Sequence, residues 1–185
     1  MTRNRMFNPF ALASLFLALL LTAAPSRFAS AKPPAQPGET PGAANEFIDR
    51  FIGSWLGEGD FAGTPVHESF ECARVLGGNF LLIKDREIGG AGFEGDIYLG
   101  YDALDKRYEL TVFTNFNGFG AGLPFRQMTG QRSGDTLVME ERHGRAPLRY
   151  TFEFLDQDTF RFTKAFVKGH NVRTIVVEVF SRQPA

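Results

Sequence analysis

Hydrophobic and polar residues alternate one by one along most of the chain after residue 54. In the segment 148–154, for example, Tyr150 and Phe152 alternate with Arg149 and Thr151. A period of two is typical of a β-strand that buries one face. With breaks rich in Gly, Asp and Asn, the pattern predicts ten strands: residues 55–61, 66–75, 80–88, 93–101, 107–115, 123–131, 136–142, 148–155, 159–167 and 172–181.

A single segment with helical spacing precedes these strands. The apolar residues of segment 45–52 recur at positions i, i+1, i+4 and i+5 from Phe47 onwards, and Gly53 follows them. This spacing puts the apolar side chains on one stripe of a two-turn helix that ends at the glycine. No helical period occurs after it, so the pattern predicts an all-β domain with one short N-terminal helix.

Ten strands joined by short turns form an antiparallel up-and-down meander. An open meander would leave two edges unpaired, so we expect a closed, calycin-like barrel of about ten strands. The last strand is apolar on both faces, with Val176 and Phe180 on one and Val177 and Val179 on the other. A strand of this kind is expected to be covered outside as well as inside. The helix 45–52 is therefore expected to lie against the wall near that strand or to plug the barrel mouth.

The start of the first strand places a tryptophan among glycines. Trp55 lies between Gly53 and Gly57, and Gly59 follows at the same spacing. Glycines let a strand bend sharply enough to close a sheet, and we expect Trp55 to plug the barrel base. Because the first and last strands of a ten-strand meander run antiparallel, Arg182 is expected to lie near Trp55.

The first 31 residues have the features of an export signal. Arg3 and Arg5 precede an apolar stretch at 10–24, and the small residues Ala29 and Ala31 flank Ser30. This order is that of a signal peptide of the general secretory route, with the mature chain starting at Lys32 in a bacterial periplasm or outside the cell. The expected organisation is a signal peptide at 1–31, a Pro-, Gly- and Ala-rich linker at 32–44 and one barrel domain at 45–185.

Removal of the signal leaves 17 basic and 21 acidic residues. This acidic balance disfavours nucleic acid as a partner, and no later segment approaches the length of a membrane span. The single cysteine, Cys72, is expected to be a buried apolar residue and not a catalytic thiolate.

Several segments together resemble a bacterial family known as domain of unknown function 1579. They read FIGSWLGEG at 51–59, VLGGNFL at 75–81, GYD at 100–102 with KRY at 106–108, and GDTL at 134–137. The resemblance covers residues 47–182 and extends to lipocalins, fatty-acid-binding proteins and nitrobindins. It implies a barrel that holds a small molecule, in a family without an established activity. Nitrobindins bind haem through a His on the final strand; here His170 falls in the preceding turn, so haem is disfavoured and no cofactor is expected.

Other candidate chemistry is sparse. His67, Ser69 and Glu71 share one face of the second strand, but residues four apart on a strand lie about 13 Å apart, too far to share a metal ion or a proton. A solvated polar face accounts for them. His143 and His170 lie in turns, and no pair of histidines has metal-ligand spacing. We therefore assign no catalytic or metal-binding residue from the sequence.

The segment 113–122 combines three Phe with three Gly and is expected either to cap the barrel or to gate its mouth. The residues expected to bind a ligand are Tyr98, Phe113, Phe116, Phe119, Phe152 and Phe162. The leading hypothesis is an exported protein that binds a small apolar molecule. A cavity-based enzyme, such as an isomerase or a haem-dependent scavenger, should instead show convergent ionisable groups inside, and an interaction module should have a barrel filled by its own side chains.

Overall fold

The computed structural model describes residues 39–90, 92–115, 125–141 and 147–184. Within them the chain forms a helix, a short 3-10 turn and ten strands. The bounds are α1 Pro41–Asp49, β1 Gly53–Phe61, β2 Thr64–Val75, η2 Leu76–Gly78, β3 Phe80–Glu87, β4 Glu94–Asp102, β5 Arg107–Thr114, β6 Phe125–Ser133, β7 Thr136–Glu141, β8 Leu148–Phe154, β9 Thr159–Lys168 and β10 Asn171–Arg182. Every strand begins and ends within two residues of the position that the alternation predicts.

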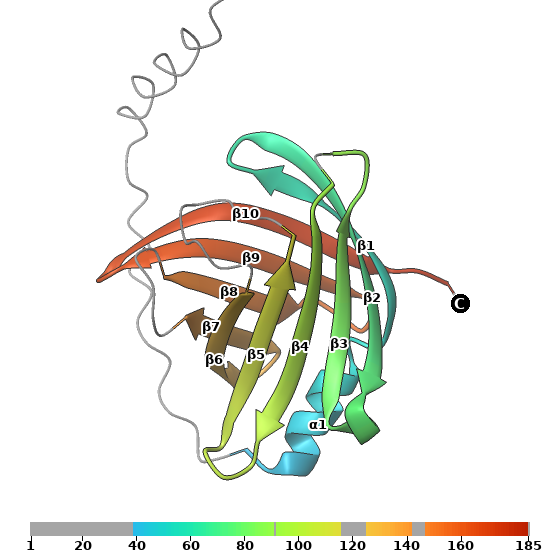
Figure 1. Cartoon of the computed structure of the whole chain (residues 1–185), viewed down its shortest axis with the longest axis vertical. Coiled ribbons are helices and arrows are strands. Elements are labelled where there is room, and N and C mark those ends of the chain that lie inside the picture. The colour runs from blue at the N-terminus through green and yellow to red at the C-terminus, as the bar shows by residue number, and fades with distance from the viewer. Residues whose placement is uncertain (1–38, 91, 116–124, 142–146, 185) are drawn as a thin grey trace, which may run out of the picture. The chain divides into compact units, whose positions relative to one another are not determined.

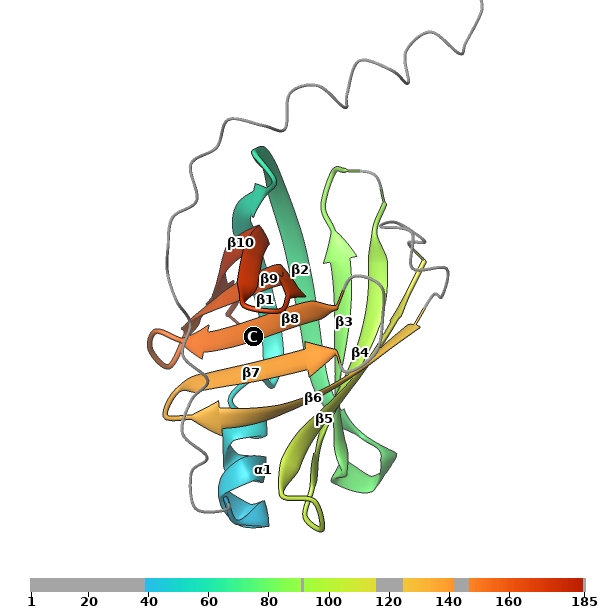
Figure 2. The ribbon, with the colours of Figure 1, turned by 90° about the vertical axis from the view of Figure 1, so that its left-hand side faces the viewer.

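The ten strands form a closed barrel in which each strand pairs antiparallel with its neighbours in the sequence. The first strand, β1, also pairs with the last, β10, so the sheet has no free edge (Figure 1). Figure 2 shows β6, β7 and β8 crossing β3 and β4 at a steep angle, as tilted strands do when they wrap around a barrel. The predicted all-β, up-and-down barrel is confirmed.

Helix α1 begins four residues before the predicted start. Thr40 caps it, because its side-chain oxygen accepts a hydrogen bond from the backbone N–H of Ala43 at 3.3 Å, and Pro41 occupies the first turn. A threonine cap followed by proline is a standard helix start, and here it lies upstream of the apolar stripe. The helix ends at Asp49. Within the described part of the chain, no helix has both the length and the apolar character needed to cross a membrane.

The helix plugs one end of the barrel (Figure 1). The ring of Phe47 lies edge-to-face on Phe154 and Tyr108, with ring centres 5.6 and 6.0 Å apart, and Phe51 packs in the same way on Phe152 at 5.6 Å. Each such pair stabilises the fold by about 0.5–1.5 kcal/mol beyond the free energy gained from burying the rings. The helix therefore plugs the barrel at the end where Trp55 lies, and plugging one end is one of the two positions expected for it.

The expectation that the outer face of the last strand is covered is wrong. A β-bulge between Thr174 and Val176 breaks the alternation, so Ile175 and Val176 are both buried. Beyond the bulge, the outward side chains of Val177 and Val179 remain 40% and 39% exposed. Isolated apolar residues on a surface are common, and β-branched side chains fit a pleated sheet well, so this face needs no second layer.

The base of the barrel is built around Trp55, which is 1% exposed. Its indole N–H donates to the carbonyl oxygen of Phe51 at 2.7 Å, and the guanidinium carbon of Arg182 lies 4.1 Å from the centre of its ring. Arg182 also donates to the carbonyl oxygens of Arg50 at 2.8 Å and Ile52 at 2.5 Å. The contact that the sequence predicts between Trp55 and Arg182 is present, and it ties the end of β10 to the segment that follows α1.

Aromatic side chains occupy the half of the barrel interior next to α1. The rings of Phe160 and Phe180 stack with centres 4.9 Å apart and an angle of 4° between their planes. Phe70 lies 4.1 Å from Phe180, and Phe152 lies 5.0 Å from Phe162. This half of the interior is therefore occupied by the chain's own side chains.

Candidate functional site

Four ionisable side chains face the barrel interior beyond the aromatic half. They are Glu68 on β2, Asp85 on β3, Lys164 on β9 and Glu178 on β10, and we refer to them as the interior charged cluster. The three carboxyl-bearing residues are 7%, 3% and 0% exposed, respectively. Charged residues are almost never this deeply buried unless they are paired, so the cluster is the strongest candidate site in the described structure.

Strand alternation places each of these residues inside. Glu68 precedes the buried Phe70 by two residues, and Asp85 follows the buried Ile83 by two. Glu178 lies two residues before the buried Phe180. Since residues i and i+2 point to the same side of a strand, each carboxyl group is directed into the barrel by its apolar neighbour.

Two glycines on β1 allow the side chains of β10 and β2 to meet. In the strand register Gly57 pairs with Phe180 on one side and Glu68 on the other, and Gly59 pairs with Glu178. A Cβ atom at Gly59 would lie 2.0 Å from the carbonyl oxygen of Val177 and 2.7 Å from the Cγ of Glu178. At Gly57 it would lie 2.5 Å from the ring of Phe180. The bare inner face of β1 therefore gives Glu178 and Phe180 the room to lie across it.

The buried carboxyl groups hold their protons unusually tightly. Burial, followed by the charge of Glu68, raises the pKa of Glu178 from 4.5 to about 8. Burial, followed by the charge of Glu68, also raises the pKa of Asp85 well above its ordinary value. A hydrogen bond to Glu68 adds to both effects, because only a protonated carboxyl group can donate it. At neutral pH the protonated form of Glu178 therefore predominates.

Several oxygens of the cluster have no hydrogen-bond donor from the described protein. They are Oε2 of Glu68, Oδ1 of Asp85 and both side-chain oxygens of Glu178. Buried polar atoms are nearly always hydrogen-bonded, so the oxygens that the contacts of Asp85 and Glu178 with Glu68 leave unpaired indicate a missing partner.

Lys164 supplies the positive charge of the cluster. Burial lowers its pKa, but the fields of Tyr150 and the three carboxyl groups outweigh this effect and raise it. The ammonium nitrogen lies 5.6 Å from the ring centres of Phe93 and Phe162 and 5.3 Å from that of Tyr150. Three rings at this distance stabilise a cation through their negative faces. Lys164 is thus a protonated amine in an aromatic cage.

An ion pair between Arg126 and Glu141 also faces the barrel interior. Arg126 on β6 donates to both side-chain oxygens of Glu141 on β7, at 2.9 and 2.7 Å. The backbone N–H of Leu148 also donates to Glu141, at 3.2 Å. Both contacts come from the Nη1 atom of Arg126, and with the backbone N–H of Leu148 they engage the carboxylate of Glu141 within the protein.

The residues that the sequence proposes as ligand-binding do not come together. Phe152 and Phe162 are buried inside the barrel, but Tyr98 and Phe113 lie on its outer face, where their rings pack edge-to-face at 6.0 Å. Phe113 is 48% exposed, because it alternates with the buried Val112 on β5. A ligand in the interior would therefore not contact Tyr98 or Phe113. Phe116, Phe119 and most of the expected lid lie outside the described residues.

The other sequence interpretations can be compared directly with the structure. His67 and Glu71 are exposed on the outer face of β2, so a solvated polar face does account for them. Cys72 is 5% exposed, and burial raises the pKa of its thiol to about 12, which confirms a buried apolar role. His170 is exposed in the turn before β10, and His143 lies outside the described residues.

Sequence reasoning missed all four members of the cluster, although a signal was present. Each is a charged residue that interrupts the apolar side of an otherwise amphipathic strand, as Lys164 does between Phe162 and Phe166. On β2, His67 and Glu71 form an ordinary polar face, whereas the unusual residue of that strand is Glu68 on the opposite face. A charge in an apolar row is the pattern that would have identified the site.

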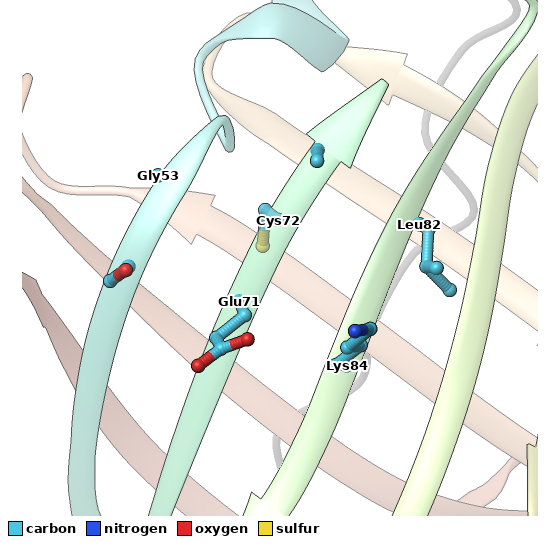
Figure 3. A pocket seen from close by; sticks show the side chains of 7 residues that line it. Gly53, Glu71, Cys72, Leu82 and Lys84 are labelled. Atoms are coloured by element: carbon cyan, nitrogen blue, oxygen red, sulfur yellow. The ribbon is translucent and has the colours of Figure 1, made fainter. Parts of the chain in front are cut away.

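A hollow of about 210 Å³ lies in the barrel wall over β1, β2 and β3 (Figure 3). Its lining comprises Gly53, Ser54, Glu71, Cys72, Ala73, Leu82 and Lys84. Glu71 and Lys84 face each other across β2 and β3, and both are exposed. Because this hollow is lined largely by solvated outward-facing residues, we favour the interior cluster as the functional site. Across the described ranges, no set of three or more His, Cys, Asp or Glu residues has the geometry to hold a metal ion.

Comparisons with known proteins support the fold and go no further. No protein-family model matches the sequence, and no curated protein matches it. Among solved structures, the chain is similar to the S-type phycobiliprotein lyase CPES from Guillardia theta, with a TM-score of 0.50 and 15% sequence identity. The match covers 76% of this chain and 92% of that one. At this identity the similarity shows a shared calycin-like antiparallel barrel.

Proposed function

We propose that the barrel binds a small, largely apolar molecule and anchors its polar group on the interior charged cluster. The observation that carries the proposal is the set of buried carboxyl oxygens on Asp85 and Glu178 that have no donor in the described protein. Leaving a buried polar atom unpaired costs about 1–3 kcal/mol. A bound polar group that supplies the missing partner recovers this free energy.

The surroundings of the cluster suit the apolar part of such a molecule. Phe162 and Tyr150 lie on the interior side of β9 and β8, respectively, with ring centres 5.3 Å apart. Both rings lie beside the ammonium of Lys164. Sites for small molecules are mostly apolar, with a few polar groups that fix the orientation of the ligand. The barrel interior has this composition, and the calycin-like fold is consistent with it.

Binding of the neutral fluorescent dye N-phenyl-1-naphthylamine to the mature chain tests the proposal. We expect the dye to become brighter on binding and Phe162→Ala to weaken its binding at least about fivefold. Glu71→Gln, which changes an exposed carboxyl group on the outer face of β2, is the matched control and should leave binding unchanged. If neither the dye nor any molecule that co-purifies with the protein binds, the barrel is a filled interaction module and the proposal is wrong.

A second candidate function is an isomerase that uses the same cluster. It is favoured by Glu178, whose pKa of about 8 suits proton transfer near neutral pH, beside a protonated Lys164. Such an enzyme should catalyse exchange of acidic C–H protons of small ketones with D₂O, followed by NMR. Exchange that disappears in Glu178→Gln would support the isomerase, whereas exchange at the uncatalysed rate would leave binding as the function.

We also propose that the protein is exported and that it belongs to the family known as domain of unknown function 1579. The charged start, the apolar stretch and the Ala-Ser-Ala sequence at 29–31 support export. The motifs at 51–59, 75–81, 100–108 and 134–137 support the family assignment. N-terminal sequencing of protein recovered from a bacterial periplasm should start at Lys32; a chain that starts at Met1 would contradict export.

A further inference from the structure

We propose that the polar group bound by the interior charged cluster is a cation, specifically the ammonium of an aliphatic amine. This inference rests on the proposed binding function and names the class of ligand for the same site. It is drawn from the ratio of acidic to basic groups in the interior, from the unpaired oxygens of Glu178 and from the aromatic cage around Lys164.

The charges of the interior favour an added cation over an added anion. The cluster holds three carboxyl groups against the single ammonium of Lys164. The guanidinium of Arg126 is already bound by both oxygens of Glu141. A ligand carboxylate would therefore meet three acidic groups that could ionise only by repelling it, and Arg126 already has an acidic partner. A ligand ammonium would instead meet acidic groups that outnumber the bases.

The unpaired atoms are acceptors, which an ammonium can satisfy. Both side-chain oxygens of Glu178 are buried, their only hydrogen-bonding neighbour is the carboxyl group of Glu68, and the residue is 0% exposed. Oδ1 of Asp85 is in the same state. An ammonium has three N–H donors and no acceptor, so it matches a site of unpaired carboxyl oxygens.

The aromatic cage shows that this part of the barrel already accommodates a cation. The rings of Phe93, Tyr150 and Phe162 all lie within 5.6 Å of the nitrogen of Lys164. Aromatic faces attract an ammonium and repel an anion. A second ammonium bound beside these rings would meet the same aromatic faces together with the repulsion of Lys164, so the carboxyl groups must supply most of its attraction.

Binding of a cation should release a proton from the protein. The groups that face Glu178 are Glu68 from β2, Asp85 from β3 and Lys164 from β9, whereas β1 contributes Gly57 and Gly59, which have no side chain. Glu87 on β3 is engaged by the backbone N–H of Phe93 at 3.2 Å. When an ammonium approaches, a protonated carboxyl group becomes a carboxylate, its proton leaves to solvent, and the ion pair remains.

Displacement of N-phenyl-1-naphthylamine by three matched probes tests the inference: n-octylamine, n-octanol and n-octanoate. We expect octylamine to bind at least about tenfold more tightly than octanoate and more tightly than octanol. Its affinity should rise between about pH 6 and about pH 9, because carboxyl groups ionise while the amine stays charged. Calorimetry in two buffers of different ionisation enthalpy should detect about one proton released per amine bound.

Variants identify the group that releases the proton. Glu178→Gln should abolish most of the proton release, and it should weaken the binding of octylamine but not that of octanol. Asp85→Asn provides an independent variant if Glu178→Gln fails to fold. Glu71→Gln, on the outer face, should behave like the unchanged protein. If octanoate or octanol displaces the dye as well as octylamine does, the ammonium inference is wrong while the binding function stands. If the dye itself does not bind, the proposed function fails instead.

Discussion

Replacing Glu178 with glutamine should make the stability of the barrel much less dependent on pH between about pH 5 and about pH 8.5. Glutamine has the shape of a protonated glutamic acid and can still donate a hydrogen bond to Glu68, but it cannot ionise. The side chain is 0% exposed and lies over Gly59, so the amide fills the same space.

The direction of this pH dependence follows from the raised pKa of Glu178. In the unfolded chain Glu178 releases its proton near pH 4.5, whereas the folded barrel keeps it up to about pH 8. Over that interval the folded state binds more protons, so the free energy of unfolding falls as pH rises. The shift corresponds to a loss of up to about 5 kcal/mol at pH 8.5. Asp85, whose pKa is also raised, acts in the same direction. Lys164, whose pKa is raised above 10.5, changes its contribution only at higher pH.

Urea denaturation of the chain from Lys32 onwards, at half-unit steps of pH, measures the effect directly. We expect the free energy of unfolding of the unchanged protein to decline across the interval, and the curve of Glu178→Gln to be flatter and to lie higher above about pH 8. Glu71→Gln should follow the unchanged protein. A free energy of unfolding that rises with pH, or a variant curve parallel to that of the unchanged protein, would refute the reasoning.

Three further predictions concern the wall and the base of the barrel. Trp55→Ala should lower the free energy of unfolding by about 3–5 kcal/mol, and a loss below about 1 kcal/mol in urea denaturation would contradict its central position. Gly59→Ala should cost about 1–3 kcal/mol because its Cβ meets the backbone of β10, whereas Gly42→Ala, with no atom within 4 Å, should be neutral or stabilising in the same assay. Cys72, whose pKa burial raises to about 12, should react with a disulfide reagent at about pH 8 only after unfolding; rapid labelling of the folded chain would show that the thiol is accessible.

The alternation of side chains was enough to predict the barrel, because in antiparallel strands a period of two directly reports burial. The prediction failed where a bulge or a helix cap changed what the pattern of apolar residues indicates. In β10 the bulge at Thr174 changes which residues face inward, and a bulge leaves no mark in the pattern of apolar residues. The helix began earlier than predicted because the cap at Thr40 lies upstream of the apolar stripe.

The candidate site was harder to predict than the fold because its members come from four strands. Aromatic residues were expected to bind the ligand, but Phe113 faces outward, whereas Phe162 faces inward beside Lys164. Sequence alone places a residue on one side of its strand; which side is the interior depends on the register of the closed sheet. Glu68 and Asp85 lie on the adjacent strands β2 and β3, but Glu178 joins them only when β10 pairs with β1, and no local motif unites the three.

The pairing of β1 with β10 makes the site depend on closure of the barrel. Trp55 and Arg182 are register partners although most of the chain separates them, and contacts of such long range form slowly during folding. Glu178 reaches Glu68 only across the glycines of β1, after this seam has closed. A chain that stops before β10 would lack Glu178 and expose two strand edges to other chains. Ligand binding would thus also report that synthesis and folding had reached the final strand.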